Sequence, residues 1–326
     1  MSNAFFHFFG TDKDYFKVMF EDLLNSQDTI YYDFEFSRKK SLFRILSIIL
    51  KRNVLNCKRI RLFKKFVFFL FLRSIKICKT KRNVFVFFGH SFELADFDCF
   101  DFIRKKIPDC KLFFYIEDNV SYFKNWRSDF DLDYLKRKFD FVLSYNKLDA
   151  QRYSLVFHPL FYPMNKALPP HEKEYDVFFA GSNKNRLNKL ISVYDELTNQ
   201  GMKCMFFILG VDEKNQVVRP GIVYNKCLNY HQIIEYMSRS SGILELITNG
   251  FEGFTLRVLE ALTFDKILFT DNFFLKEVFA ENAPIIYLDS NLQNSMKRLA
   301  TIPFNWGEKK FSGKQFVSDL TAMIDG

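Results

Sequence analysis

Short apolar runs alternate with stretches of helical periodicity through most of this chain. In the first half, the apolar runs cover 83–89, 111–118, 139–146 and 155–162. Helical patterns lie between them, at 96–108 and 131–139. Short buried strands that alternate with helices are typical of a parallel sheet covered on both faces. The first half is therefore predicted to be an α/β domain.

A stretch with three prolines, "PMNKALPPHEKE" at 163–174, interrupts this alternation and is interpreted as a linker. Beyond it, strands are predicted at 175–182, 203–210, 221–224, 242–247, 266–272 and 284–289. Helices are predicted at 185–201, 230–241, 254–264 and 312–324. We expect two Rossmann-like domains, 1–165 and 166–326, facing each other across a cleft, with the last helix packing back on the first domain. Ligands of such sheets bind beyond the carboxyl ends of the strands.

Composition agrees with a folded protein of two domains. The chain has 326 residues, of which 48% are hydrophobic and 26% charged. The 43 phenylalanines are interpreted as core residues in positions that other sequences give to Leu or Ile. The six cysteines form no CxxC pair, which favours buried free thiols in a reducing cytosol over a disulfide framework or a zinc site.

The positive charge is concentrated in one segment. Residues 38–82 contain 16 Lys or Arg and no Asp or Glu, whereas the rest of the chain holds 31 basic and 38 acidic residues. Apolar blocks such as "FVFFLFL" separate the charges, and seven residues are too few to span a bilayer. An amphipathic basic segment can lie on an anionic membrane surface. A buried strand between two solvated helices is the alternative, and nucleic-acid binding is disfavoured because no recognised motif accompanies the charge.

The stretch "NGFEGFTLRVLEALTFDKILFTDN" at 249–272 carries the candidate chemistry. It places a loop between a predicted strand and a predicted helix, so the amides of Gly253, Phe254 and Thr255 would form an anion site suited to a diphosphate. Glu260 could accept hydrogen bonds from a ribose diol. Arg257 either neutralises phosphate charge or points to solvent.

These residues resemble the E-x7-E signature of retaining GT-B glycosyltransferases, commonly written E-G-F-G-L-P-V-L-E-A. The matching positions are Glu252, Gly253, Phe254, Leu256, Val258, Leu259, Glu260 and Ala261. The resemblance implies that Glu252 contacts the donor sugar and Glu260 the nucleotide ribose. Arg257 departs from the family, where a proline is usual. The same stretch resembles bacterial capsule and lipopolysaccharide transferases of the G-L-T-x-R-x-x-E-A-L type, in which the first acid varies.

Basic residues follow the first strand of the second domain. Gly181 and Ser182 end that strand, and Arg186 and Lys189 stand near the start of the next helix. In GT-B enzymes this loop faces the donor phosphates, and cations there stabilise the departing diphosphate. Arg186 is preferred over Lys189 for this role, and surface charges on a helix are the alternative.

The first domain offers three further candidates. His90 follows a predicted strand and could orient an acceptor or donor hydroxyl. Glu117 and Asp118 follow the next strand, and either could act as a base if the enzyme inverts. The D-x-D patterns at 96–101 and 129–133 begin helical segments, where Asp favours helix N-termini over a metal site.

The prediction is thus a metal-independent glycosyltransferase without cofactor, retaining by resemblance. By that same resemblance, it is expected to move a sugar from a UDP-sugar donor to a lipid-linked or oligosaccharide acceptor in bacterial surface polysaccharide assembly. The expected partners are the nucleotide sugar, the acceptor and an anionic membrane surface, without nucleic acid. The expected location is the cytoplasm, at the inner face of the membrane. The alternatives are a nucleotide-sugar epimerase or hydrolase on the same scaffold and a non-catalytic, membrane-tethered module.

Overall fold

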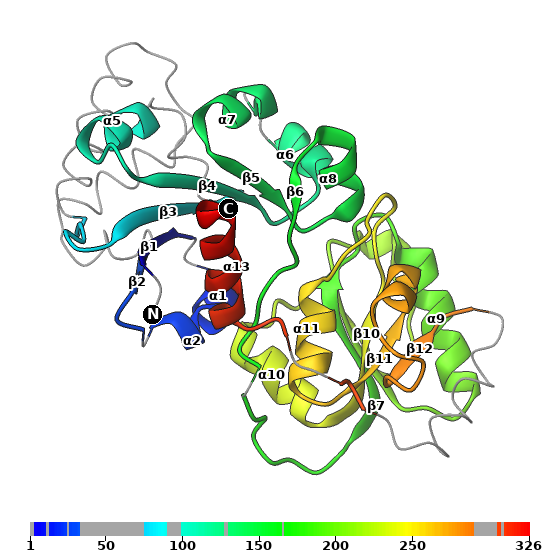
Figure 1. The fold of residues 1–326 in the computed structure, drawn as a ribbon. Helices are drawn as coiled ribbons and strands as arrows, with labels where there is room; N and C mark the ends of the chain where they lie inside the picture. Colours follow the sequence, from blue (N-terminus) through cyan, green and yellow to red (C-terminus); the bar gives the residue numbers. More distant parts are fainter. Residues whose placement is uncertain are drawn as a thin grey trace, which may run out of the picture. The chain divides into compact units, whose positions relative to one another are not determined.

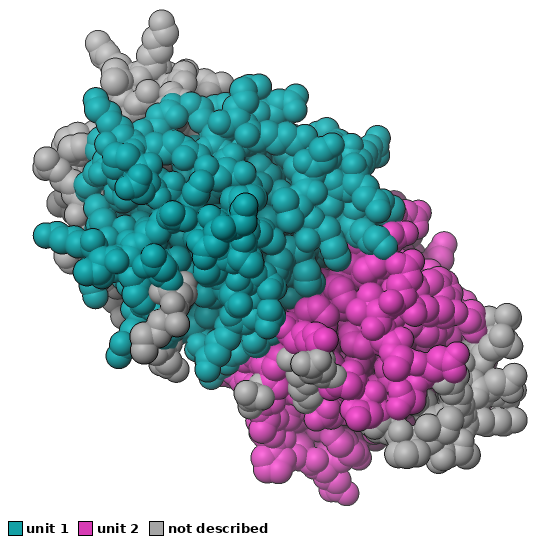
Figure 2. All heavy atoms as spheres, viewed as in Figure 1, with its two compact units in different colours: residues 1–161, 312–326 teal, residues 162–311 magenta. Residues whose placement is uncertain are grey.

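The computed structural model describes residues 3–10, 13–24, 26–32, 75–89, 99–126, 130–164, 166–289, 305–307 and 310–326. These residues form two parallel sheets of six strands each, with helices between the strands (Figure 1). The chain divides into unit 1, residues 1–161 and 312–326, and unit 2, residues 162–311 (Figure 2). The predicted pair of Rossmann-like α/β domains is confirmed.

The sheet of unit 1 has the strand order β2-β1-β3-β4-β5-β6. Its strands are β1 (Ala4–Phe9), β2 (Thr29–Tyr32), β3 (Arg82–Phe88), β4 (Lys111–Ile116), β5 (Phe141–Ser144) and β6 (Val156–Phe157). The last four match the predicted runs, although β3 begins one residue before its run and β6 is only two residues long. The sequence patterns did not identify β1 and β2. Every residue of β1 is buried, and a short apolar run without alternation carries no period that distinguishes strand from helix.

Seven helices accompany this sheet within the described residues. They are α1 (Asp14–Met19), α2 (Glu21–Leu24), α5 (Cys99–Lys106), α6 (Val120–Trp126), α7 (Leu132–Lys138), α8 (Lys147–Tyr153) and α13 (Gly313–Asp325). The D-x-D acid Asp131 is the N-cap of α7 and accepts a hydrogen bond of 2.9 Å from the amide of Tyr134. The expected helix-start role of this aspartate is therefore confirmed.

Helix α13, at the end of the chain, packs within unit 1. Phe316 is 1% exposed, and its ring stacks on Phe161 with centroids 4.5 Å apart. His158 Nε2 lies 3.1 Å from a carboxylate oxygen of Asp319 on the same helix. Aromatic packing and one polar contact thus attach the last helix to the first sheet.

The sheet of unit 2 has the order β12-β11-β10-β7-β8-β9. Its strands are β7 (Tyr175–Ser182), β8 (Cys204–Leu209), β9 (Ile222–Tyr224), β10 (Ser240–Glu245), β11 (Ile267–Thr270) and β12 (Ile285–Tyr287). Its helices are α9 (Leu187–Asn199), α10 (Tyr230–Ser238) and α11 (Leu256–Thr263), with the 3₁₀ turns η3 (Glu213–Asn215) and η4 (Phe273–Glu277). The chain builds outward from β7 to β9 and then returns to β10 on the other side of β7. The topological switch point, where doubly wound sheets bind ligands, therefore lies between β7 and β10.

Phenylalanine fills the core of the first sheet, as its abundance predicts. Phe9, Phe85 and Phe87 are each 1% exposed. The rings of Phe9 and Phe87 stack on neighbouring strands with centroids 4.5 Å apart and planes within 7°. Such cross-strand aromatic pairs add about 0.5–1.5 kcal/mol to the burial term.

Most of the basic segment 38–82 lies outside the described residues. Of its described end, Ile75 belongs to the core and Lys81 pairs with Asp28 at 2.6 Å. No helix among the described parts of the chain is both long and apolar enough to cross a membrane. The prediction of a membrane-facing segment stays untested.

Candidate functional site

A cavity of about 880 Å³ opens at the switch point of the second sheet. Its walls come from the loop between β7 and α9, residues 183–189, and from the start of the loop between β10 and α11, residues 247–249. Asn215 of η3 contributes from the β8–β9 connection. The carboxyl ends of the two central strands thus line a hollow of the size that holds a small ligand.

The β7–α9 loop turns sharply before its helix begins. Lys184 and Asn185 both have positive φ values, 44° and 61°, in the left-handed region that few side chains adopt. The amide of Arg186 donates to Asn183 Oδ1 at 3.1 Å, which closes the turn. This turn directs the Asn- and Lys-rich segment toward the cavity.

Arg186 connects the two loops that line the cavity. Its guanidinium donates to the carbonyl of Leu246, just after β10, and to the carbonyl of Ser182 at 3.2 Å. Burial lowers the pKa of this guanidinium, and the nearby carboxylates of Asp271 and Glu245 oppose that shift. The predicted phosphate-binding arginine is thus at the predicted sheet edge, and its cation is held by backbone carbonyls.

Lys189 and Asp271 form an ion pair that holds the start of the β10–α11 loop. Lys189 Nζ lies 2.5 Å from Asp271 Oδ2. The other oxygen of this carboxylate accepts a hydrogen bond of 2.7 Å from the amide of Ile247. Lys189 is half exposed and Asp271 is buried, so the pair lies at the rim of the cavity.

Glu245 is the last residue of β10, just before the β10–α11 loop, and it is buried at 2% exposure. Its carboxyl accepts hydrogen bonds from the hydroxyls of Thr255 and Thr270, the latter at 2.5 Å. Burial raises the pKa of Glu245 to about 7, and the hydroxyl bonds partly offset that effect. Thr255 is the N-cap of α11, yet its hydroxyl makes no cap hydrogen bond to that helix.

Glu260 lies in the second turn of α11, fully enclosed. It pairs with Arg257 one turn earlier and accepts a hydrogen bond of 2.5 Å from the hydroxyl of Tyr230. Arg257 also lies 3.4 Å from the carbonyl of Ala180 on β7. The expectation that Arg257 could point to solvent is wrong, because its side chain is only 18% exposed and ion-paired. Its contact with phosphate stays a prediction.

The other motif residues surround the start of α11. The carbonyl of Gly253 accepts a hydrogen bond of 3.0 Å from Asn272 Nδ2. Phe254 is 3% exposed, and its ring lies 4.6 Å from that of Phe311. Glu252 is half-buried in the loop itself. The loop part of the motif thus buries the ring of Phe254 and leaves the acid Glu252 nearer the surface.

Gly181 and Ser182 end strand β7 as predicted. Ser182 is exposed, whereas a Cβ on Gly181 would lie 3.1 Å from the ring of Phe179. Gly181 therefore allows the close approach of this ring. Its expected role toward a ligand remains untested.

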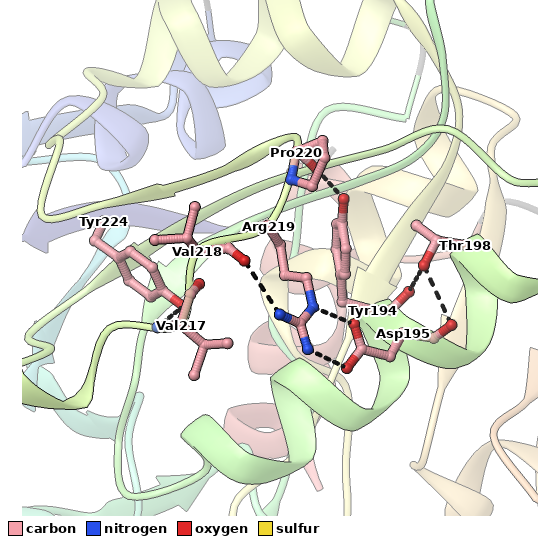
Figure 3. A network of polar contacts seen from close by, with 8 residues as sticks. All are labelled: Tyr194, Asp195, Thr198, Val217, Val218, Arg219, Pro220 and Tyr224. Carbon is pink, nitrogen blue, oxygen red and sulfur yellow. Dashed lines mark hydrogen bonds and ion pairs between the residues drawn. The ribbon is translucent and has the colours of Figure 1, made fainter.

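The β8–β9 connection, which carries Asn215, is attached to α9 by the network in Figure 3. The guanidinium of Arg219 donates to both carboxylate oxygens of Asp195, at 2.8 and 3.2 Å. Tyr194 donates to the carbonyl of Pro220, and the hydroxyl of Tyr224 donates to the carbonyl of Val217 at 3.0 Å. The β8–β9 connection, which forms the third wall of the cavity through Asn215, is therefore held in place by an ion pair and by hydrogen bonds to backbone carbonyls.

In unit 1, Glu117 and Asp118 follow β4 at its carboxyl end, as predicted. A carboxylate oxygen of Glu117 accepts a hydrogen bond of 2.5 Å from the amide of Gly89 at the end of β3. His90 lies outside the described residues. The catalytic roles predicted for these three residues stay predictions.

Two buried side-chain atoms in the described chain have no hydrogen-bond partner, Arg186 Nε and Asn272 Oδ1. Both belong to the carboxyl edge of the second sheet. Unsatisfied buried polar atoms are rare in folded proteins, and each calls for a specific explanation. The sequence patterns did not single out Asn272, Asp271 or Glu245, although polar residues at the ends of apolar strands were the available signal.

No family model matches the sequence, and no curated protein sequence matches it. Among solved structures, an alpha-glucosyltransferase in complex with UDP-glucose and DNA containing an abasic site aligns with 99% of this chain and 99% of its own, at 9% identity and a TM-score of 0.58. An alpha-glucosyltransferase bound to UDP and a 13-mer DNA with a central A:G mismatch covers 99% of this chain and 100% of its own, at 10% identity and a TM-score of 0.53. A UDP-N-acetylglucosamine 2-epimerase reaches a TM-score of 0.49 at 9% identity, covering 100% of this chain and 95% of its own.

The likeness to the two alpha-glucosyltransferase structures establishes a shared fold. The GT-B architecture expected from the sequence, two Rossmann-like domains in one chain, is therefore confirmed. At such low sequence identity a shared fold does not establish a shared activity, because one fold can support many functions.

Proposed function

We propose that this protein is a glycosyltransferase whose second unit binds a nucleoside diphosphate sugar, in the first instance a UDP-sugar. The observation that carries the proposal is the cavity at the switch point, lined by the two strand-to-helix loops at the carboxyl ends of β7 and β10. The fold likeness to an alpha-glucosyltransferase that binds UDP-glucose supports the same donor class.

The donor diphosphate would lie between the β7–α9 loop and the start of α11. Arg186 and Lys189 supply positive charge there, and the uncapped amides at the α11 N-terminus supply further donors. Breaking the bond between sugar and diphosphate leaves negative charge on the departing group. Fixed cations and amides stabilise that charge in the transition state more than in the bound substrate.

The two motif acids differ in what their proposed roles require. Glu252 is half-buried and stands beside the cavity loop, so contact with the donor sugar needs no rearrangement of the core. Glu260 is enclosed and paired with Arg257 and Tyr230. Its proposed hydrogen bonds to the ribose require one of these partners to give way.

For the acceptor, we propose a lipid-linked or oligosaccharide glycan, as the resemblance to polysaccharide transferases implies. The structures of similar fold were solved with DNA, and the basic segment 38–82 would suit that polyanion as well as a membrane surface. DNA is therefore the second candidate acceptor. The peripheral membrane location rests on the charge pattern alone.

Donor binding is tested by calorimetry with UDP-glucose, UDP-N-acetylglucosamine and GDP-mannose, followed by an assay for slow donor hydrolysis with EDTA or with Mn²⁺. Replacing Arg186→Gln keeps a donor toward Leu246 and removes the charge. We expect donor affinity to fall roughly ten- to hundredfold, the size of a charge-assisted contact. The control Lys203→Ala makes the same charge change before β8, at the opposite edge of the sheet. Absence of binding by every donor refutes the proposal.

The remaining alternatives give different products. Inverted donor stereochemistry without transfer indicates an epimerase, and binding without turnover indicates a non-catalytic module. Transfer to a lipid-linked oligosaccharide, compared with transfer to duplex DNA, decides the acceptor, and the anomeric configuration of the product decides between retention and inversion. A requirement for Mn²⁺ would show that the predicted metal independence is wrong.

A further inference from the structure

Glu245 is a buried carboxyl beneath a site that is proposed to bind an anion. Both of its oxygens accept hydrogen bonds, one from the hydroxyl of Thr255 and one from that of Thr270. The charged and titratable groups around it come from three elements. They are Asp271 after β11, Arg186 in the β7–α9 loop and Tyr287 on β12. An ionised Glu245 would therefore repel a diphosphate and, through Thr255, occupy a donor near it.

The directions of these hydrogen bonds depend on one proton. Thr270 Oγ1 accepts from the amide of Asn272 at 3.0 Å, so its own hydroxyl proton goes to Glu245. Thr255 donates to Glu245 when the carboxyl is ionised. When the carboxyl is protonated, the same contact can reverse, with Glu245 donating and Thr255 accepting. The hydroxyl proton of Thr255, at the N-cap of α11, is then available to an anion.

We propose that Glu245 is a positioning residue that couples proton uptake to donor binding: it becomes protonated as the anionic donor binds, and Thr255 then donates its hydroxyl to the donor diphosphate. Proton uptake removes a negative charge beneath the diphosphate and supplies a hydrogen-bond donor in the same step. This inference rests on the proposed function, because it takes the cavity ligand to be a nucleoside diphosphate sugar.

Burial sets this carboxyl up to exchange its proton near neutrality. It raises the pKa of Glu245 to about 7, and the charge of Asp271 adds to the rise. The hydrogen bonds from the two threonines act in the opposite direction. Both protonation states are thus accessible at physiological pH.

The test measures the Kd of UDP-glucose between about pH 6 and about pH 8. UDP-glucose is the probe because its diphosphate is esterified at both ends and has no group that titrates near neutrality. If binding selects the protonated form, the Kd of the parent protein rises about tenfold over this range. In Glu245→Gln, whose amide can donate to Thr255 permanently, the Kd stays flat and close to the parent value at low pH. Thr255→Val binds more weakly at low pH and keeps only the part of the pH dependence that comes from the charge of Glu245.

Glu235→Gln is the control, since it removes an exposed carboxylate on α10 that does not line the cavity and should keep the tenfold change. Calorimetry in buffers of different ionisation enthalpy should show proton uptake by the parent and none by Glu245→Gln. Equal pH dependence in the parent and Glu245→Gln overturns the inference while leaving the proposed function intact. If no donor binds, carboxyl ¹³C NMR of the free protein still decides: a Glu245 carboxyl that titrates below about pH 5 cannot carry this coupling.

Discussion

The two units share a six-stranded parallel sheet but bury different chemistry. Within the described residues, unit 2 buries four charged side chains, Glu245, Glu260, Lys266 and Asp271, whereas unit 1 buries two histidines and no Asp, Glu, Lys or Arg. An unpaired buried charge costs several kcal/mol, so stability alone favours the phenylalanine packing of unit 1. Glu260 and Asp271 are ion-paired, with Arg257 and Lys189, whereas Glu245 is held by two threonine hydroxyls and Lys266 by the carbonyl of Ser240. Two of the four, Glu245 and Asp271, lie at the carboxyl edge of the sheet beside the cavity.

The largest effect should come from separating the buried pair of unit 2. Arg257→Ala leaves Glu260 enclosed without its cation, and we expect the free energy of unfolding of unit 2 to fall by about 3–5 kcal/mol. Peptide-resolved hydrogen exchange of α11 measures this loss. The double variant Arg257→Met with Glu260→Gln removes both charges and keeps an acceptor for Tyr230, so most of the stability should return. An Arg257→Ala protein as stable as the parent would show that the pair contributes little.

Acid should destabilise unit 1 through His7, which is fully buried in β1 and hydrogen-bonded to Asn83 Oδ1 at 3.0 Å. Burial lowers its pKa to about 4 from an ordinary value of 6.5. The unfolded chain therefore binds the proton first, and stability that is present above about pH 6.5 is lost as the pH falls through about 4. The loss should reach about 3 kcal/mol. Hydrogen exchange of β1 across this range measures it, and His7→Gln should remove the dependence. An unchanged slope in His7→Gln would assign the acid sensitivity to another group.

Unit 2 should respond to pH in the opposite direction. The raised pKa of Glu245 means that its stabilising contribution is complete below about pH 4.5 and is lost as the pH rises through about 7. The expected loss is about 3 kcal/mol, the free energy that corresponds to a pKa raised from 4.5 to about 7. Hydrogen exchange of β10 and α11 in the parent and in Glu245→Gln measures the difference, with Glu235→Gln on the exposed face of α10 as the control. Parallel pH profiles in units 1 and 2 would contradict the comparison.

The smallest effect should come from the ion pair in Figure 3. Arg219 and Asp195 are both 38% exposed, and exposed pairs contribute about 1 kcal/mol or less. Arg219→Ala should therefore lower the thermal stability of unit 2 only slightly, as measured by calorimetric unfolding. Donor affinity should change less than in Arg186→Gln, because Arg219 does not line the cavity. A larger loss of affinity would mean that this anchor orders the third wall for binding.

The sequence by itself determined much of the α/β architecture. Alternating buried strands and helices predicted the second sheet strand by strand, since β7 spans the predicted 175–182 and β10 ends within the predicted 242–247. Periodicity and strand-to-helix junctions are local properties, so they can be identified from the sequence without knowing which residues are in contact. They also located Arg186, Lys189 and the start of α11 at one sheet edge.

Only the tertiary structure decided what those side chains do. Arg257 pairs with Glu260, Arg186 holds the carbonyl of Leu246, and Glu245 lies beneath Thr255 and Thr270. The contacts of Arg186 with Leu246 and of Glu245 with Thr270 join residues that strand order brings together. Strand order follows from long-range packing that no local pattern encodes. The same reason explains why β1 and β2 were missed. A fully buried apolar hexamer is identified as a strand only by the neighbour, β3, with which it pairs.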